Sequence, residues 1–107
     1  MYNKSKIIPI YIIDIDDTIC KSNISNYSKA KPIFERINII NKLYDEGCKI
    51  IYWTSRGSKT GITKRKKEIT RKQLKNWGCK YHKLKIGKPY YNFWIDDKAI
   101  NANEFFK

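Results

Sequence analysis

The chain has 107 residues, of which 23 are Lys or Arg and 10 are Asp or Glu, so its formal net charge is +13. This length predicts one domain over residues 1–107, because single domains commonly hold about 50 to 250 residues. No apolar run is long enough for a membrane-spanning helix, and the short apolar run near the amino terminus lacks the order of a signal peptide. We therefore expect a cytoplasmic protein with no membrane partner.

The first half of the chain predicts a strand followed by a helix. Residues 7–13 are apolar, as in a buried strand, and lead directly into Asp-Ile-Asp-Asp-Thr at residues 14–18. A helix is expected from Pro32, since the first turn of a helix does not need the missing amide hydrogen. Ile37 and Ile40 then share one helical face, which we expect to pack on a sheet.

The second half repeats this alternation. Residues 48–53 predict a second strand, and a flexible loop over residues 57–61 leads to a basic helix over residues 63–77. A short third strand is expected over residues 81–86 and a fourth over residues 91–95. Strands separated by helices connect by right-handed crossovers. The order predicts a minimal Rossmann-like α/β domain, with a parallel sheet and helices on both faces.

Polar residues follow each predicted strand. Asp14 and Asp16 come after the first strand, and Thr-Ser-Arg-Gly at residues 54–57 comes after the second. Gly-Lys-Pro at residues 87–89 follows the third strand, and Asp-Asp-Lys at residues 96–98 follows the fourth. In open α/β sheets, ligands bind outside the carboxyl ends of the strands. We therefore expect these four segments to form one site.

The two aspartates suggest a reaction centre. Asp14 and Asp16 should point to the same side, because side chains alternate along a strand. Two carboxylates placed together repel each other unless a proton or cation holds them, and a hard cation such as Mg²⁺ prefers oxygen ligands. One carboxylate could then attack an electrophile while the other moves protons. The alternative is an Asp-rich turn that hydrogen-bonds to its own backbone.

The order of these segments resembles the haloacid dehalogenase (HAD) superfamily, which includes aspartate-nucleophile phosphatases. Residues 14–18, Thr54, Lys88 and the Asp pair at residues 96–97 match its four motifs in order, over most of the chain. Asp17 stands where the commonest form has glycine. Two stretches, residues 52–57 and residues 87–99, are similar to those of small phosphatases without a cap domain. The resemblance implies a magnesium-dependent hydrolase of phosphomonoesters that acts through an aspartyl-phosphate intermediate.

The resemblance also implies the roles of individual residues. Asp14 would be the nucleophile, and Asp16 would protonate the leaving oxygen and then activate water. Thr54 would hold a phosphate oxygen, and Lys88 would offset the charge on Asp14 and on the transferring group. The expected Mg²⁺ ligands are Asp14, the backbone carbonyl of Asp16, and Asp97 or its neighbour Asp96.

Three further residues are candidates for substrate binding. The amides around Ser55 could bind phosphate oxygens. Arg56 could bind a second anionic group of the substrate, or it could pair with Asp17 or Asp97. Tyr90 lies next to the third polar segment and could contact the substrate.

The positive charge leaves the class of substrate open. It is densest at Lys-Arg-Lys-Lys, residues 64–67, which could bind a polyanion. The lysines are nevertheless spread along the chain, so a solvated helix face is the simpler explanation. We expect a small phosphorylated substrate such as a sugar phosphate or a nucleotide. The alternatives are a phosphatase acting on nucleic-acid ends and a non-catalytic basic binding module on the same fold.

Cysteine and histidine contribute no predicted catalytic group. Cys20, Cys48 and Cys79 form no Cys-x-x-Cys pair, which predicts reduced and mostly buried thiols. Cys20 lies near the aspartates, but the one histidine, His82, falls on the predicted third strand, away from the polar segments.

Overall fold

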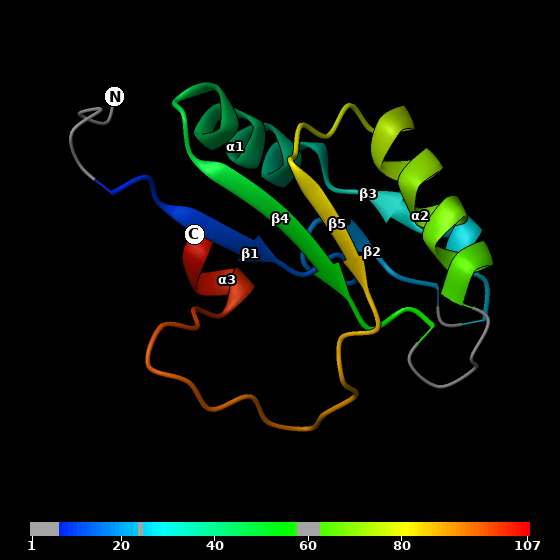
Figure 1. Ribbon diagram of the computed structural model, residues 1–107. Helices are drawn as coiled ribbons and strands as arrows, with labels where there is room; N and C mark the ends of the chain where they lie inside the picture. Colours follow the sequence, from blue (N-terminus) through cyan, green and yellow to red (C-terminus); the bar gives the residue numbers. More distant parts are fainter. Residues whose placement is uncertain (1–6, 24, 58–62) are drawn as a thin grey trace.

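The computed structural model is a small α/β fold built on a parallel sheet (Figure 1). The residues that the structure describes are 7–23, 25–57 and 63–107. Strands β1 (Ile10–Ile13), β4 (Lys49–Thr54) and β5 (Lys83–Ile86) pair in the order β1-β4-β5, and both pairings are parallel. The predicted parallel arrangement of the first three strands is therefore confirmed.

Two helices connect these strands. The first, α1 (Phe34–Asp45), begins two residues after Pro32, so the predicted start of this helix is wrong. Pro32 instead belongs to β3 (Lys31–Pro32), which pairs antiparallel with β2 (Cys20–Lys21) in a small ribbon. The second helix, α2 (Thr63–Asn76), ends one residue earlier than predicted. The predicted loop over residues 57–61 lies mostly outside the described residues.

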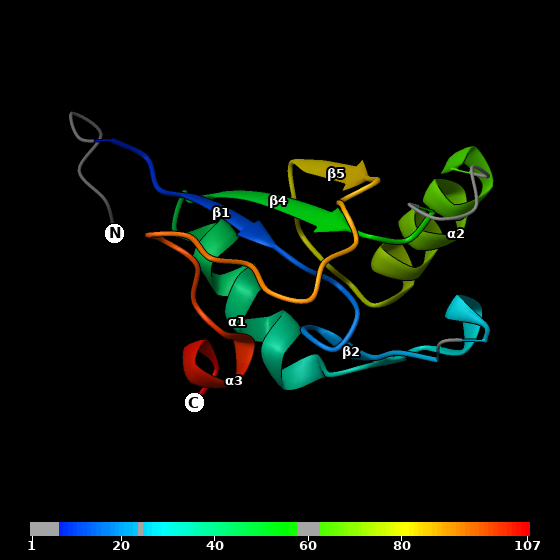
Figure 2. The ribbon, with the colours of Figure 1, turned by 90° about the horizontal axis from the view of Figure 1, so that it is seen from below.

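Two short elements complete the fold. The 3-10 turn η1 (Tyr27–Lys29) lies between β2 and β3 and packs against α2. At the carboxyl end, α3 (Ala102–Phe105) lies on the same side of the sheet as α1 (Figure 2). Arg36 of α1 donates a hydrogen bond of 3.0 Å to Asn103 of α3. Phe105 packs against the core.

The core lies on one face of the sheet. Its buried side chains include, from the strands, Ile13, Ile50, Tyr52 and Leu84, and from the helices, Ile37, Ile40 and Leu74. The opposite face carries Ile10 and Ile12, which are 60% and 62% exposed. Lys83 and Lys85 of β5 also lie on that face, and their charges disfavour packing of the basic helix α2 there. The prediction of helices on both faces is thus wrong for α1 and α2, which share one core.

The predicted fourth strand, residues 91–95, does not form. The segment is exposed and runs outside the sheet from β5 towards α3 (Figure 1). The segment contacts the sheet through an aromatic side chain. Trp94 packs edge-on against Trp53 of β4, with ring centroids 6.1 Å apart, and against Tyr91, with ring centroids 5.0 Å apart. The apolar composition of the segment therefore reflects aromatic packing on the open face of the sheet. Within the described residues, β1 is an edge strand.

None of the helices in the described part of the chain is both long and apolar enough to cross a membrane. The cysteines are free thiols, and Cys20 and Cys48 are buried, as predicted.

Candidate active site

Three of the four predicted polar segments meet at the carboxyl edge of the sheet. Asp14 follows β1, Thr54 ends β4 and Lys88 comes two residues after β5. The backbone amide of Lys88 donates a 2.9 Å hydrogen bond to the carbonyl of Thr54. Gly87 has φ +83, a conformation that L side chains rarely adopt, and it lets the chain turn directly after β5. The fourth segment, residues 96–98, is not part of this edge.

Asp14 and Lys88 form the exposed half of the site. The Lys88 Nζ lies 4.0 Å from Asp14 Oδ1, and the two side chains are 12% and 34% exposed. Burial raises the pKa of Asp14 above its usual value, and the nearby Lys88 ammonium opposes this rise. Thr18 donates a long hydrogen bond of 3.5 Å to Asp14 Oδ2. Asp14 thus has one cation within reach and keeps part of its carboxylate in contact with solvent.

Aromatic side chains hold Lys88 in this position. Its ammonium donates a 3.2 Å hydrogen bond to the Tyr91 hydroxyl and lies 5.1 and 5.2 Å from the ring centroids of Tyr91 and Trp94. These rings remove water from the ammonium without neutralising its charge. The segment over residues 91–95 therefore contributes to the site through its rings, although it forms no strand.

Asp16 and Arg56 form the buried half of the site. Arg56 donates from Nε to Asp16 Oδ2 at 2.9 Å and from Nη2 to Asp16 Oδ1 at 2.7 Å. Its remaining Nη1 donates to Thr70 and Gln73, and its guanidinium lies 4.8 Å from the centroid of the Tyr27 ring. Arg56 is only 1% exposed. The carboxylate beside Arg56 is therefore that of Asp16. The guanidinium is buried and is not open to the substrate, contrary to the prediction that it could bind a second anionic group.

Thr54 also differs from its predicted role. Its side chain is buried, and its hydroxyl accepts a 3.2 Å hydrogen bond from the backbone amide of Arg56. Ser55 is half-buried, and its hydroxyl lies 3.5 Å from the carbonyl of Pro89. In this arrangement Ser55 is the better placed of the two hydroxyls to meet a phosphate oxygen.

The other acidic residues of the prediction lie apart from Asp14. Asp17 has φ +61, and its carboxylate accepts hydrogen bonds from the amide and the hydroxyl of Ser22. The left-handed φ explains why glycine suits this position in the resembled family. Asp96 accepts from the amide of Lys98 in an exposed turn, and Asp97 is also exposed. These two residues do not join the site as predicted.

The expected magnesium ligands are therefore not assembled. Within residues 7–23, 25–57 and 63–107, no three His, Cys, Asp or Glu side chains lie close enough together to hold a metal ion. Asp14 offers a carboxylate, and both carboxylate oxygens of Asp16 are bonded to Arg56, which leaves the backbone carbonyl of Asp16 as its predicted ligand. Mg²⁺ is usually held by one or two carboxylates and fills the rest of its octahedral shell with waters and substrate phosphates, so these two groups fit part of such a shell.

Two further predictions concern neighbours of the site. Tyr90 is 64% exposed, and its contact with substrate stays a prediction. Burial raises the pKa of the Cys20 thiol to about 12, so the thiol is protonated at neutral pH and is not an activated nucleophile.

The partners of Arg56 were not predicted from the sequence. The hydrogen bonds of this network join residues that are 14 to 46 positions apart. Arg56 contacts Thr70 and Gln73, and Gln73 contacts Tyr27. Thr70 and Gln73 are three residues apart on the predicted helix, and a polar pair on its inner face was the available signal.

The comparisons with known proteins support the fold. No protein-family model matches the chain, and no curated protein matches it. The structure is similar to the crystal structure of an MCSG target from Vibrio cholerae, with a TM-score of 0.82 and 26% sequence identity. The match covers 92% of this chain and 88% of the other. The two proteins thus share the same α/β architecture over nearly their whole lengths.

Proposed function

We propose that the protein hydrolyses small phosphomonoesters, such as a sugar phosphate or a nucleotide, with Asp14 as the nucleophile. The observation that carries the proposal is the Asp14 carboxylate beside the Lys88 ammonium, 4.0 Å away, at the carboxyl ends of parallel strands. The Lys88 charge can offset negative charge on Asp14 and on an incoming phosphoryl group. The resemblance of the four motifs to phosphatases of the HAD superfamily agrees with this chemistry.

The reaction has two steps. In the first, an oxygen of Asp14 bonds to phosphorus, the bond from phosphorus to the leaving oxygen breaks, and Asp16 gives that oxygen a proton. In the second, water attacks the phosphorus and loses a proton to Asp16, and the bond to Asp14 breaks to release phosphate. Asp16 is 22% exposed, which leaves it access to the reacting groups.

Arg56 would orient the proton carrier in both steps. Its two hydrogen bonds fix the plane of the Asp16 carboxylate. Within the described residues, no third Asp, Glu, His or Cys side chain joins Asp14 and Asp16. The two steps use only side chains of this chain. Dependence on Mg²⁺ stays a prediction from the motif resemblance.

A substrate screen with paired variants tests the proposal. p-Nitrophenyl phosphate, sugar phosphates and nucleotides would be assayed with and without Mg²⁺. Asp14→Asn should lower turnover by at least about a thousandfold, because an amide is a poor nucleophile. Asp17→Asn is the matched control, since Asp17 lies in the same loop but bonds to Ser22. It should keep most of the activity.

Two more variants separate the roles. Asp16→Asn should still form the phospho-enzyme from p-nitrophenyl phosphate, whose leaving group needs no proton, but should hydrolyse it slowly. Lys88→Met should lower kcat/KM by about a hundredfold, as expected for loss of one charge that stabilises the transition state. Equal turnover by Asp14→Asn and the parent protein would overturn the proposal.

A further inference from the structure

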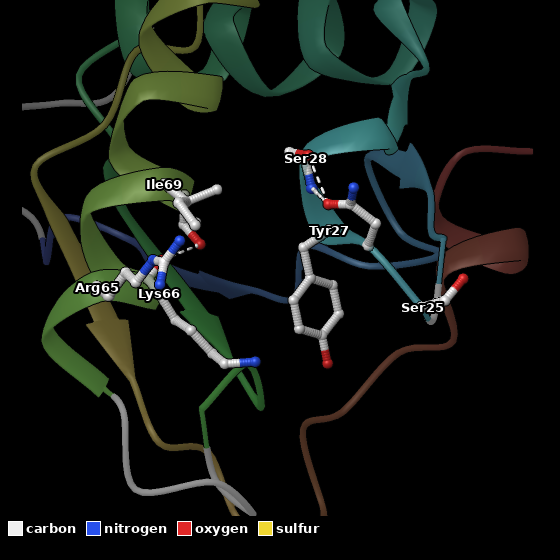
Figure 3. A pocket seen from close by; sticks show the side chains of 8 residues that line it. Ser25, Tyr27, Ser28, Arg65, Lys66 and Ile69 are labelled. Carbon is white, nitrogen blue, oxygen red and sulfur yellow. Dashed lines mark hydrogen bonds between the residues drawn. The ribbon is translucent and has the colours of Figure 1, made fainter.

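A cavity of about 300 Å³ lies between the turn η1 and the helix α2 (Figure 3). Tyr27 and Ser28 approach it from η1, and Arg65 and Lys66 approach it from the first turns of α2. Thr70, one turn further along α2, forms part of its wall. The volume is at the lower end of the range for small-molecule sites and admits a sugar-sized ligand.

The lining of this cavity suits an anion. The Lys66 ammonium extends towards Tyr27, 5.0 Å from the centroid of its ring (Figure 3). Within the described part of the chain, neither Lys66 nor Arg65 forms an ion pair with a carboxylate. Among the described residues, no acidic side chain lines the cavity, and Ser25 and Ser28 belong to its wall. Two cations without a counter-charge, beside serine side chains, favour an anionic ligand that also carries hydroxyl groups.

The cavity adjoins the buried half of the candidate active site. Thr70 belongs to its wall and also accepts a 3.1 Å hydrogen bond from Arg56. Gln73 links the two in a second way, because it accepts from Arg56 and donates to the carbonyl of Tyr27. Arg56 in turn holds Asp16. Arg56, with its partners Thr70 and Gln73, therefore connects the wall of the cavity to Asp16, the residue that would protonate the leaving oxygen.

We infer that this cavity binds the leaving group of the substrate and selects a hydroxylated leaving group that carries a second anionic group, a phosphate or a carboxylate. The inference rests on the proposed function. The reacting phosphoryl group lies at Asp14 and Lys88, and the carbon skeleton extends past Asp16 towards η1. Lys66 and Arg65 bind the second anion.

The ratio of kcat/KM between matched substrates tests this inference. Fructose 6-phosphate and glucose 6-phosphate have hydroxyls but no second anion. Fructose 1,6-bisphosphate adds a phosphate to the first, and 6-phosphogluconate has a carboxylate in place of the aldehyde carbon of the second. The parent protein should prefer one or both doubly anionic compounds by about tenfold or more, the effect of one charge-assisted contact. The preferred compound distinguishes the two kinds of anion.

Variants assign the preference to the cavity. The double variant R65A/K66A should reduce the preference about tenfold. Lys72→Ala removes one charge from an exposed position of the same helix and should leave the preference unchanged. A preference that is absent in the parent protein, or equal in R65A/K66A, would overturn the inference.

Direct binding separates this inference from the proposed function. If no phosphomonoester is hydrolysed, the proposed function fails. Calorimetric titration of the protein with fructose 1,6-bisphosphate and 6-phosphogluconate then still measures whether the cavity binds these anions. Binding that is weakened in R65A/K66A but not in Lys72→Ala would support an anion site there. Unchanged or undetectable binding of both compounds would rule it out.

Discussion

The candidate site contains two carboxylate–cation pairs of opposite character. Asp16 and Arg56 meet through two short hydrogen bonds, and the guanidinium is almost fully buried. Asp14 and Lys88 are 4.0 Å apart and partly open to solvent. Both pairs join the loop after β1 to the end of another strand, β4 for Arg56 and β5 for Lys88, yet only the second pair is partly open on the side where a substrate would bind.

This difference separates orientation from chemistry. A buried pair in which each guanidinium nitrogen donates a hydrogen bond is held rigidly, and breaking it leaves a charge in a dry environment. A looser, partly solvated pair can exchange partners, so Lys88 can bind an incoming phosphoryl group without abandoning a buried partner. We therefore assign orientation to Arg56 and charge compensation to Lys88.

The largest expected effect breaks the buried pair. Arg56→Ala should lower the free energy of unfolding by about 3–5 kcal/mol, because it leaves Asp16, Thr70 and Gln73 without their shared donor. Chemical denaturation measures this value. Arg71→Ala is the control, because its ion pair with Glu68 is exposed, and it should change the same quantity by no more than about 0.5 kcal/mol. If both variants lower the free energy of unfolding by a similar amount, the buried Arg56 pair stabilises the fold no more than an exposed ion pair does.

The pH dependence of the exposed pair gives the next effect. Because the pKa of Asp14 is raised, the proposed nucleophile becomes ionised only above the usual range, and the acid limb of kcat/KM should lie correspondingly higher. Lys88→Met removes the charge that opposes this rise, so the limb should move to still higher pH. The rate profiles of the two proteins with one substrate measure the shift. Identical acid limbs would show that Lys88 does not act on Asp14.

The same raised pKa also affects stability. For a carboxyl group of this kind, the linked stability is present below the unfolded value, near 3.8, and is lost as pH rises through the folded pKa. Asp14→Asn avoids that loss. The free energy of unfolding of the variant should therefore gain on that of the parent protein as pH rises from acid to neutral.

The smallest expected effect concerns magnesium and the segment around Trp94. Asp97 lies three residues after Trp94, which packs on Trp53, so we expect this packing to change if Asp97 joins Asp14 in holding Mg²⁺. Mg²⁺ should then change tryptophan fluorescence and raise the melting temperature modestly, because it binds only the folded protein. Asp97→Ala should remove both responses. If the parent protein shows neither response, the two pairs operate without the predicted third carboxylate.

Much of the fold follows from local patterns in the sequence. Most elements lie close to their predicted ranges: the strand before Asp14, the two helices and the third strand. Both signals behind these predictions are local, namely the regular spacing of apolar residues and the glycines that follow helices. The same patterns place Asp14, Ser55 and Lys88 at one edge of the sheet, since parallel strands bring their carboxyl ends together. The predicted strand over residues 91–95 failed because aromatic residues suit both a strand and a surface cluster.

The amino-acid sequence by itself determined which segments carry charge and which strand ends they follow. Only the tertiary structure decided which cation meets which carboxylate. Arg56 lies 40 positions from Asp16, and no local period distinguishes this partner from Asp17 or Asp97. The choice depends on burial, because in the dry space beneath η1 and α2 each guanidinium nitrogen needs a hydrogen-bond acceptor. Lys88, near the surface, has no such requirement and stays beside Asp14.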